Sequence, residues 1–139
     1  MTRVFADTQY WLAVTDRRDQ WAPVAARAMA RITRPEIVTT DEVLVEFLGF
    51  VCGGGRYLRE LGLGVVRMID ADPSVTVVPR SRTSFLDGLA LYEARPDKGY
   101  SLVDCISMVT MRELGIGGAL TADRHFRQEG FRALLLDEV

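Results

Sequence analysis

The chain has 139 residues, 48% of them hydrophobic, and a formal net charge of −2 at pH 7. This length suits one domain with a buried core and leaves no room for a second, and the small net charge gives no global reason to bind nucleic acid. With one histidine and one lysine, the chain cannot supply a three-histidine metal site or a Gly-Lys-Ser phosphate loop. Carboxylates are the reactive groups that remain.

The sequence suggests a protein of the cytoplasm. No apolar stretch is long enough to cross a membrane, and residues 1–4 lead directly into an apparent strand rather than a signal peptide. Cys52 and Cys105 lack the spacing of metal ligands, and a reducing cytosol argues against pairing them. Both cysteines are therefore interpreted as small core residues.

The chain begins with a strand and two helices. Residues 3–6 are apolar and are followed by Asp7 and a threonine, which predicts a buried strand that ends at a helix cap. Residues 9–14 then predict a first helix. After a polar loop, the alanine-rich residues 21–32 predict a second helix.

A second strand and a helical hairpin come next. Residues 37–39 predict the strand, and Thr39 and Glu42 have the spacing of a capping box. Apolar residues at helical spacing over 43–51 predict a helix that a triple glycine ends, and residues 56–69 predict a helix that packs back on it.

The second half of the chain continues the alternation. Residues 75–78 are β-branched and predict a strand. Two helices that open on serine caps follow at 81–94 and 101–111. Short strands are expected at 118–121 and 133–136, with a polar turn between them.

Strands that alternate with helices imply right-handed crossovers and a mostly parallel five-stranded sheet. Helices then cover both faces, so residues 1–139 should form a single three-layer α/β/α domain. In such sheets the functional crevice lies beyond the carboxyl ends of the strands, where the strand order reverses. Asp7 follows the first strand and Asp123 follows the fourth, so we expect them near this crevice.

Four acidic residues lie where a strand leads into a helix or where a helix begins. They are Asp7, Glu46, Asp104 and Asp123. If they converge, their mutual repulsion requires a cation or raised pKa values, and Mg²⁺ or Mn²⁺ is the best fit for an all-oxygen site. Paired ions ~4 Å apart can activate a water and stabilise the leaving oxygen in phosphodiester cleavage. The sequence leaves open whether one ion or two would bind.

Each acid also has a structural interpretation. Asp7 could cap the first helix, Asp104 could take part in a cap three residues after its serine, and Asp123 could cap the turn that follows it. Glu46 lies beyond the free amides of its helix, among the apolar residues Val45, Phe47 and Phe50 in the sequence. A carboxylate there needs a cation or a hydrogen bond to offset its burial.

The segments that carry these acids resemble, in order and spacing, the PIN-domain ribonucleases, especially VapC-type toxins. The matching segments are Val4–Thr8, Thr39–Glu46, Asp97–Cys105 and Leu120–Arg127. The resemblance implies a PIN-like fold and a metal-dependent endoribonuclease whose catalytic and metal-binding residues are Asp7, Glu46, Asp104 and Asp123. It further implies hydrogen-bond support from Thr8, Thr121 and Ser101, a small antitoxin partner and a homodimer.

Two positions depart from the pattern of the resemblance. Gln9 stands where these toxins often have a small hydroxyl residue, and Val103 stands where a threonine commonly precedes the third acid. Neither change removes a metal ligand. Both could alter the hydrogen bonds around the ligands, and such losses lower metal affinity or activity by ~10–100-fold.

Candidate RNA contacts are five cationic residues in loops or first turns: Arg80, Arg82, Lys98, Arg124 and Arg127. They could bind phosphates on either side of the cleaved bond, or equally be solvated surface charges. Tyr10 and Trp11 could stack on bases, although burial suits Trp11 better. His125 is interpreted as a turn residue or a support for the acids rather than a general base.

Two other functions remain open. The domain could be a weakly catalytic or non-catalytic PIN-like module that binds RNA or a protein, for which the helix pair over 43–51 and 58–69 could present an apolar groove. A phosphotransfer receiver domain also gathers aspartates at strand ends. Lys98 argues against it, because this lysine precedes a helix instead of following a strand.

Overall fold

The five strands form one sheet in which every pairing is parallel. The computed structural model describes residues 2–137. The strands are β1 (Thr2–Ala6), β2 (Pro35–Thr40), β3 (Val75–Val78), β4 (Gly118–Leu120) and β5 (Arg132–Ala133). Their spatial order is β3-β2-β1-β4-β5, so the direction of winding reverses between β1 and β4. The predicted five-stranded parallel sheet is confirmed, and its crevice position lies at the ends of β1 and β4.

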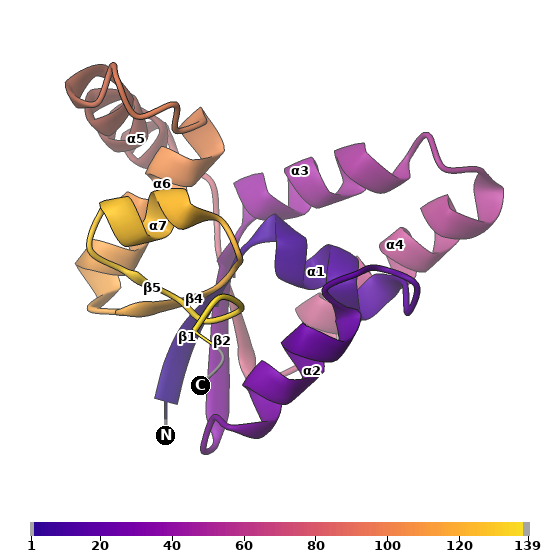
Figure 1. Cartoon of the computed structure of the whole chain (residues 1–139). Coiled ribbons are helices and arrows are strands. Elements are labelled where there is room, and N and C mark those ends of the chain that lie inside the picture. Colours follow the sequence, from indigo (N-terminus) through magenta and orange to yellow (C-terminus); the bar gives the residue numbers. More distant parts are fainter. Residues whose placement is uncertain (1, 138–139) are drawn as a thin grey trace.

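Helices cover both faces of this sheet (Figure 1). On one side are α1 (Thr8–Thr15), α2 (Ala22–Ala30), α3 (Asp41–Val51) and α4 (Arg56–Ala71); on the other are α5 (Arg82–Ala94), α6 (Leu102–Leu114) and α7 (Arg124–Gln128). This arrangement confirms the three-layer α/β/α architecture. Helices α3 and α6 come from opposite faces and contact each other. None of the helices between residues 2 and 137 is long and apolar enough to cross a membrane.

The core lies where the sheet meets both helical layers. Its largest fully buried side chains include Phe5 of β1, Phe47 of α3, Met108 of α6, Leu120 of β4 and Phe126 of α7. Burying each such side chain contributes about 1.5–3 kcal/mol. Strand ends and helix starts near this core are therefore held firmly. Asp7, Asp104 and Asp123 lie at such positions, and Glu46 lies farther along α3.

The start of α3 differs from the predicted capping box. The cap is Thr40, whose side chain accepts a hydrogen bond from the Val43 amide at 3.1 Å. Thr39 instead points inward: its hydroxyl donates to the Ala6 carbonyl at 3.0 Å and accepts from Trp11 Nε1 at 3.3 Å. Thr39 is fully buried, so its hydrogen bonds join β2 to β1 and α1 rather than closing a helix end.

The end of the chain also departs from expectation. The segment predicted as a polar turn is the short helix α7. The strand predicted at 133–136 ends at Ala133, because the amides of Leu136 and Asp137 donate to the Ala133 carbonyl at 2.9 and 3.1 Å and turn the chain.

Burial settles the other expectations for single side chains. Cys105 is buried as predicted, but Cys52 is exposed just after α3, so the prediction that both cysteines belong to the core is wrong for Cys52. Tyr10 and Trp11 are both buried. Neither ring is free to stack on a nucleotide base.

Candidate functional site

Asp7 and Asp123 extend from the ends of neighbouring strands. Asp7 precedes α1 in an extended conformation, and its side chain makes no capping hydrogen bond, so the capping interpretation is wrong for this residue. Its Oδ2 accepts from Thr121 Oγ1 at 3.0 Å, and the same Thr121 oxygen accepts from the Asp123 amide at 3.1 Å. One buried threonine hydroxyl therefore fixes both acids across the β1–β4 junction.

Glu46 reaches the same junction from α3. Its Oε1 accepts a hydrogen bond of 2.6 Å from the hydroxyl of Thr8, the buried first residue of α1. The apolar surroundings expected from the sequence are wrong in part, because Val45 is 69% exposed and Phe50 is 65% exposed. Successive helical residues point in different directions, so neighbours in the sequence need not be neighbours in space.

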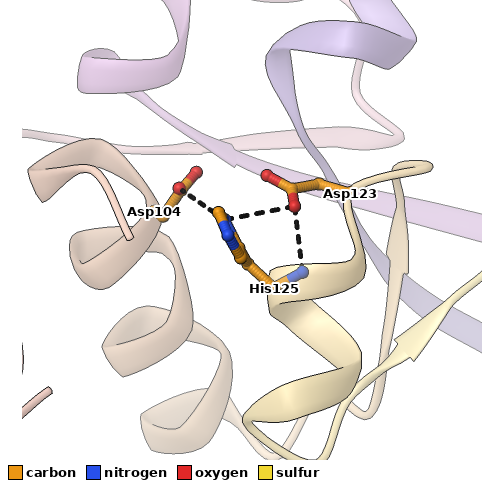
Figure 2. A group of neighbouring side chains, drawn as sticks. All are labelled: Asp104, Asp123 and His125. Carbon is orange, nitrogen blue, oxygen red and sulfur yellow. Dashed lines mark hydrogen bonds and ion pairs between the residues drawn. The ribbon is translucent and has the colours of Figure 1, made fainter. Parts of the chain in front are cut away.

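Asp104 caps a helix and also belongs to the acidic cluster. It closes a capping box at the start of α6, in which the Ser101 amide donates to Asp104 Oδ2 and the Asp104 amide donates to Ser101 Oγ, both at 3.0 Å. The predicted capping interpretation thus holds for this acid. The cap also fixes the direction of the carboxylate, which faces Asp123 and His125 (Figure 2).

His125 lies between two of the acids. Asp123 caps α7 by accepting from the His125 amide at 2.9 Å. The His125 ring then places Nδ1 at 3.2 Å from Asp123 Oδ1 and 3.9 Å from Asp104 Oδ2 (Figure 2). One potential ligand atom from each of Asp104, Asp123 and His125 lies within 4.8 Å of the others. The sequence predicted a turn or a supporting role for His125, and the one signal for this position beside the acids is its place two residues after Asp123.

The four acids form one electrostatic cluster. Burial raises the pKa of Asp7 from 3.8 to about 7, and the nearby carboxylates of Asp104 and Glu46 contribute to the increase. Burial also raises the pKa of Asp104, aided by the charges of Asp123 and Glu46 and opposed by the hydrogen bonds from Ser101. A bound cation would remove this repulsion and favour the ionised carboxylates. The residues present therefore fit a divalent ion with oxygen ligands.

The two positions that depart from the resemblance have distinct local roles. Gln9 Oε1 accepts from the Ala122 amide at 2.7 Å, so this side chain joins the start of α1 to the segment just before Asp123. Val103 is partly buried and packs against the core. Neither residue is a ligand in this arrangement.

The five predicted RNA contacts are all exposed, and no ion pair joins any of them to the four acids within residues 2–137. Arg127 pairs with Asp137, which leaves its guanidinium less free than the others to bind phosphate. The Arg82 guanidinium lies 5.1 Å from the ring centre of Phe85, on the first turn of α5.

An ion-pair network that sequence reasoning missed supports α7. Glu129 accepts hydrogen bonds from Arg95 Nε at 2.5 Å, from Arg112 Nη2 at 2.6 Å and from the Tyr100 hydroxyl at 3.2 Å. Burial alone would raise the pKa of Glu129, but the two arginines outweigh it and lower the pKa. The Tyr100 ring contacts the His125 ring edge-on, with centroids 5.2 Å apart. The three residues that bond to Glu129 lie 17 to 34 residues away in the sequence, so no local sequence pattern predicts these contacts.

Comparisons with known proteins agree with this geometry. The family model described as PIN domain matches residues 4–131. Among solved structures, the chain is similar to VapC20 of Mycobacterium tuberculosis, described as a Sarcin-Ricin loop cleaving toxin, with a TM-score of 0.83 and 23% sequence identity over 94% of this chain and 97% of that chain. No curated protein matches the sequence significantly. At this identity the structural likeness shows a shared fold.

Proposed function

This chain belongs to the PIN domain family, and on that premise we propose that it is a metal-dependent endoribonuclease, the toxin of a toxin–antitoxin pair. The observation that carries the proposal is the cluster of Asp7, Glu46, Asp104 and Asp123, in which the pKa of Asp7 is raised to about 7. Clustered acids with strongly perturbed pKa values are typical of catalytic sites. A toxin of similar fold, described as cleaving the Sarcin-Ricin loop, supports RNA as the substrate class.

The acids have the roles of ligands in this proposal. Bound Mg²⁺ or Mn²⁺ supplies positive charge that makes a water more acidic and stabilises the leaving oxygen of a phosphodiester. Burial is the main cause of the raised pKa of Asp7, with repulsion from Asp104 and Glu46 added to it, and the attraction of a bound cation would favour the ionised carboxylate. Thr121 holds Asp7 and Asp123 in place, and Thr8 holds Glu46.

Exposed cations would hold the RNA on either side of the acids. Arg80, Arg82, Lys98 and Arg124 are free to approach phosphates from the solvent side. Arg127 contributes less because of its pairing with Asp137. Replacing one of the free cations should weaken RNA binding without changing metal affinity.

We also propose protein partners, namely a small antitoxin and a second copy of this chain, in the cytoplasm. Large apolar side chains are exposed on α3 and α4 (Val45, Phe50, Tyr57, Leu63 and Met68) and on α5 (Leu86, Leu89 and Tyr92). A groove between α3 and α4 is lined in part by Leu48, Val51 and Leu63. Exposed apolar surface of this kind supports protein binding. Light scattering of the purified chain, alone and with its antitoxin, would measure both assemblies.

The test of the activity is cleavage of a pool of structured RNAs by wild type and Asp104→Asn, with Mg²⁺, with Mn²⁺ and with a chelator. Asparagine retains an oxygen that can accept from the Ser101 amide, so the α6 cap and the fold should survive. We expect the wild type to cut only with metal and the variant to lose about 100-fold or more of its activity. Asp16→Asn, at a partly exposed carboxylate outside the cluster, is the matched control. An Asp104→Asn variant that cuts like wild type would contradict the proposal.

The groove between α3 and α4 also favours the alternative function, a weakly catalytic or non-catalytic module that binds RNA or a protein. The same cleavage experiment separates the two functions. Robust metal-dependent turnover would exclude the binding module, and folded wild type that binds RNA without cutting it under any metal would favour it.

A further inference from the structure

We propose that His125 is itself a metal ligand and that its imidazole nitrogen makes the site bind Mn²⁺, and other first-row transition ions, in preference to Mg²⁺. The inference rests on the proposed function, which calls for a divalent ion but leaves its identity open. It adds a nitrogen ligand to a set of residues that otherwise offers only oxygen.

The first observation is an imidazole nitrogen that faces the acids and makes no hydrogen bond. His125 Nδ1 is buried and has no hydrogen-bond partner, although Asp123 Oδ1 lies only 3.2 Å away. The two atoms are close enough for an ion pair, but their directions do not make a hydrogen bond. Figure 2 shows the ring between the carboxylates of Asp104 and Asp123. A buried polar atom without a partner is costly, and a cation shared with the two acids would satisfy it.

The second observation is the spacing of the potential ligand atoms. Octahedral coordination with bonds of about 2.1 Å separates neighbouring ligand atoms by about 3.0 Å. The distances from His125 Nδ1 are 3.2 Å to Asp123 and 3.9 Å to Asp104, and each of the three residues has an atom within 4.8 Å of the other two. These separations are longer than one octahedral ion requires, so the three atoms would have to move closer together to share it.

The third observation is that the imidazole is already held in this orientation. Tyr100 contacts the ring edge-on, and its hydroxyl is fixed by Glu129. Gly99 lies beside the far side of the ring, where an added Cβ would be 3.9 Å from Nε2. The His125 amide is bonded to Asp123, so the backbone is fixed as well. A ligand held by its neighbours in this way loses little entropy when it binds an ion.

The preference among ions follows from the donor atoms. Mg²⁺ is a hard ion that takes oxygen ligands and keeps several waters. Mn²⁺ also accepts carboxylates, but as the first ion of the transition series it takes an imidazole nitrogen more readily than Mg²⁺ does, and Fe²⁺, Co²⁺ and Ni²⁺ bind such ligands more tightly still. Two carboxylates alone would discriminate weakly between Mg²⁺ and Mn²⁺. With His125 included, the wild type should bind Mn²⁺ about tenfold more tightly than Mg²⁺, or better.

The first test measures binding of Mn²⁺ and of Mg²⁺ by calorimetry, on chelator-treated wild type, His125→Asn and the control Gln128→Ala. Asparagine places an amide oxygen near the position of Nδ1 and so changes the donor from nitrogen to oxygen. We expect His125→Asn to lose about tenfold in Mn²⁺ affinity and less than about threefold in Mg²⁺ affinity. Gln128 is an exposed residue at the other end of α7, and its replacement should leave both affinities unchanged. Circular dichroism melting checks that each variant is folded.

The second test detects the bond between the His125 nitrogen and the metal ion directly. Pulsed electron paramagnetic resonance of bound Mn²⁺ should show ¹⁴N coupling in wild type, a change to ¹⁵N coupling when histidine is labelled, and no such coupling in His125→Asn. Absence of nitrogen coupling in wild type, or an Mn²⁺-to-Mg²⁺ affinity ratio that His125→Asn leaves unchanged, would overturn the inference. If wild type then still cuts RNA with metal, only the role of His125 fails; if wild type binds neither ion, the proposed function fails with it.

Discussion

Asp7→Asn should stabilise the metal-free protein even though it removes a proposed metal ligand. Burial and the neighbouring carboxylates raise the pKa of Asp7 from its ordinary 3.8 to about 7, so the fold resists ionisation of this residue. Asparagine has nearly the same shape and can still accept from Thr121, but it carries no charge. The substitution therefore removes a charge that burial and, to a lesser extent, repulsion make costly, while it leaves the packing in place.

The size of this effect depends on pH. Because the folded pKa lies above the unfolded one, the unfolded chain releases the Asp7 proton first, and stability is lost as pH rises from about 4 to about 7. At 1.36 kcal/mol for each pKa unit, the loss is about 2 kcal/mol at pH 5 and about 4 kcal/mol at pH 8, both upper bounds. Asp7→Asn should recover these amounts, and the gain should be constant above pH 8.

Urea unfolding with a chelator, at pH 5 and pH 8, measures the gain as a difference in the free energy of unfolding. Asp16→Asn is the matched control, because hydrogen bonds from Arg18 lower the pKa of this partly exposed aspartate and its replacement should not stabilise the protein. Saturating metal should reduce the difference in unfolding free energy between Asp7→Asn and wild type at pH 8, because a metal concentration of 100 times the Kd stabilises wild type by about 2.7 kcal/mol. An Asp7→Asn variant no more stable than wild type at pH 8, or equally stabilised at both pH values, would refute the reasoning.

Two further predictions concern the structure behind the site. Glu129→Gln should lower the free energy of unfolding by about 2 kcal/mol at pH 7, because the amide replaces a buried charge that pairs with Arg95 and Arg112. The pKa of Glu129 is lowered in the fold, so the stability that Glu129 contributes is present above its unfolded pKa and is lost as pH falls through its folded pKa. Urea unfolding should therefore show a smaller difference in unfolding free energy between wild type and Glu129→Gln at pH 3 than at pH 7. The same difference at both pH values would contradict the role of the ion-pair network. Gly88→Ala should destabilise by about 1–2 kcal/mol, because an added Cβ would lie 2.4 Å from Ile106 Cγ1 and 3.2 Å from its backbone where α5 meets α6. Gly64→Ala on α4 meets nothing within 4 Å and should stabilise by up to about 1 kcal/mol, so equal melting temperatures for the two variants would count against this packing argument.

The fold could be predicted largely because its signals are local. Short apolar segments flanked by caps identified the strands, and Ser81 and Ser101 marked the starts of α5 and α6, where both side chains cap as expected. The alternation of strands and helices then implied a parallel sheet. The predictions for the last two elements were wrong for physical reasons. Helix α7 has five residues, which are too few to show a helical period in the sequence. Strand β5 ends early because hydrogen bonds to the Ala133 carbonyl turn the chain.

The site was predictable only in part. The convergence of Asp7 and Asp123 followed from their places after strands that a parallel sheet brings together. The surroundings of Glu46 could not be judged from Val45 and Phe50, because adjacent helical residues face different sides. The orientation of His125 depends on Tyr100, 25 residues earlier in the sequence, and a contact of that kind is set only by tertiary packing.

The place of β4 beside the central strand β1 also constrains when the site can exist. Pairing of β1 with β4 joins residues 5 and 119, and the last acid follows at Asp123. During synthesis a domain generally folds as a unit once its chain has emerged. A growing or prematurely terminated chain contains Asp7 and Glu46, yet it lacks the strand that brings Asp123 to them. The acid cluster can therefore assemble only after nearly the whole protein has been made.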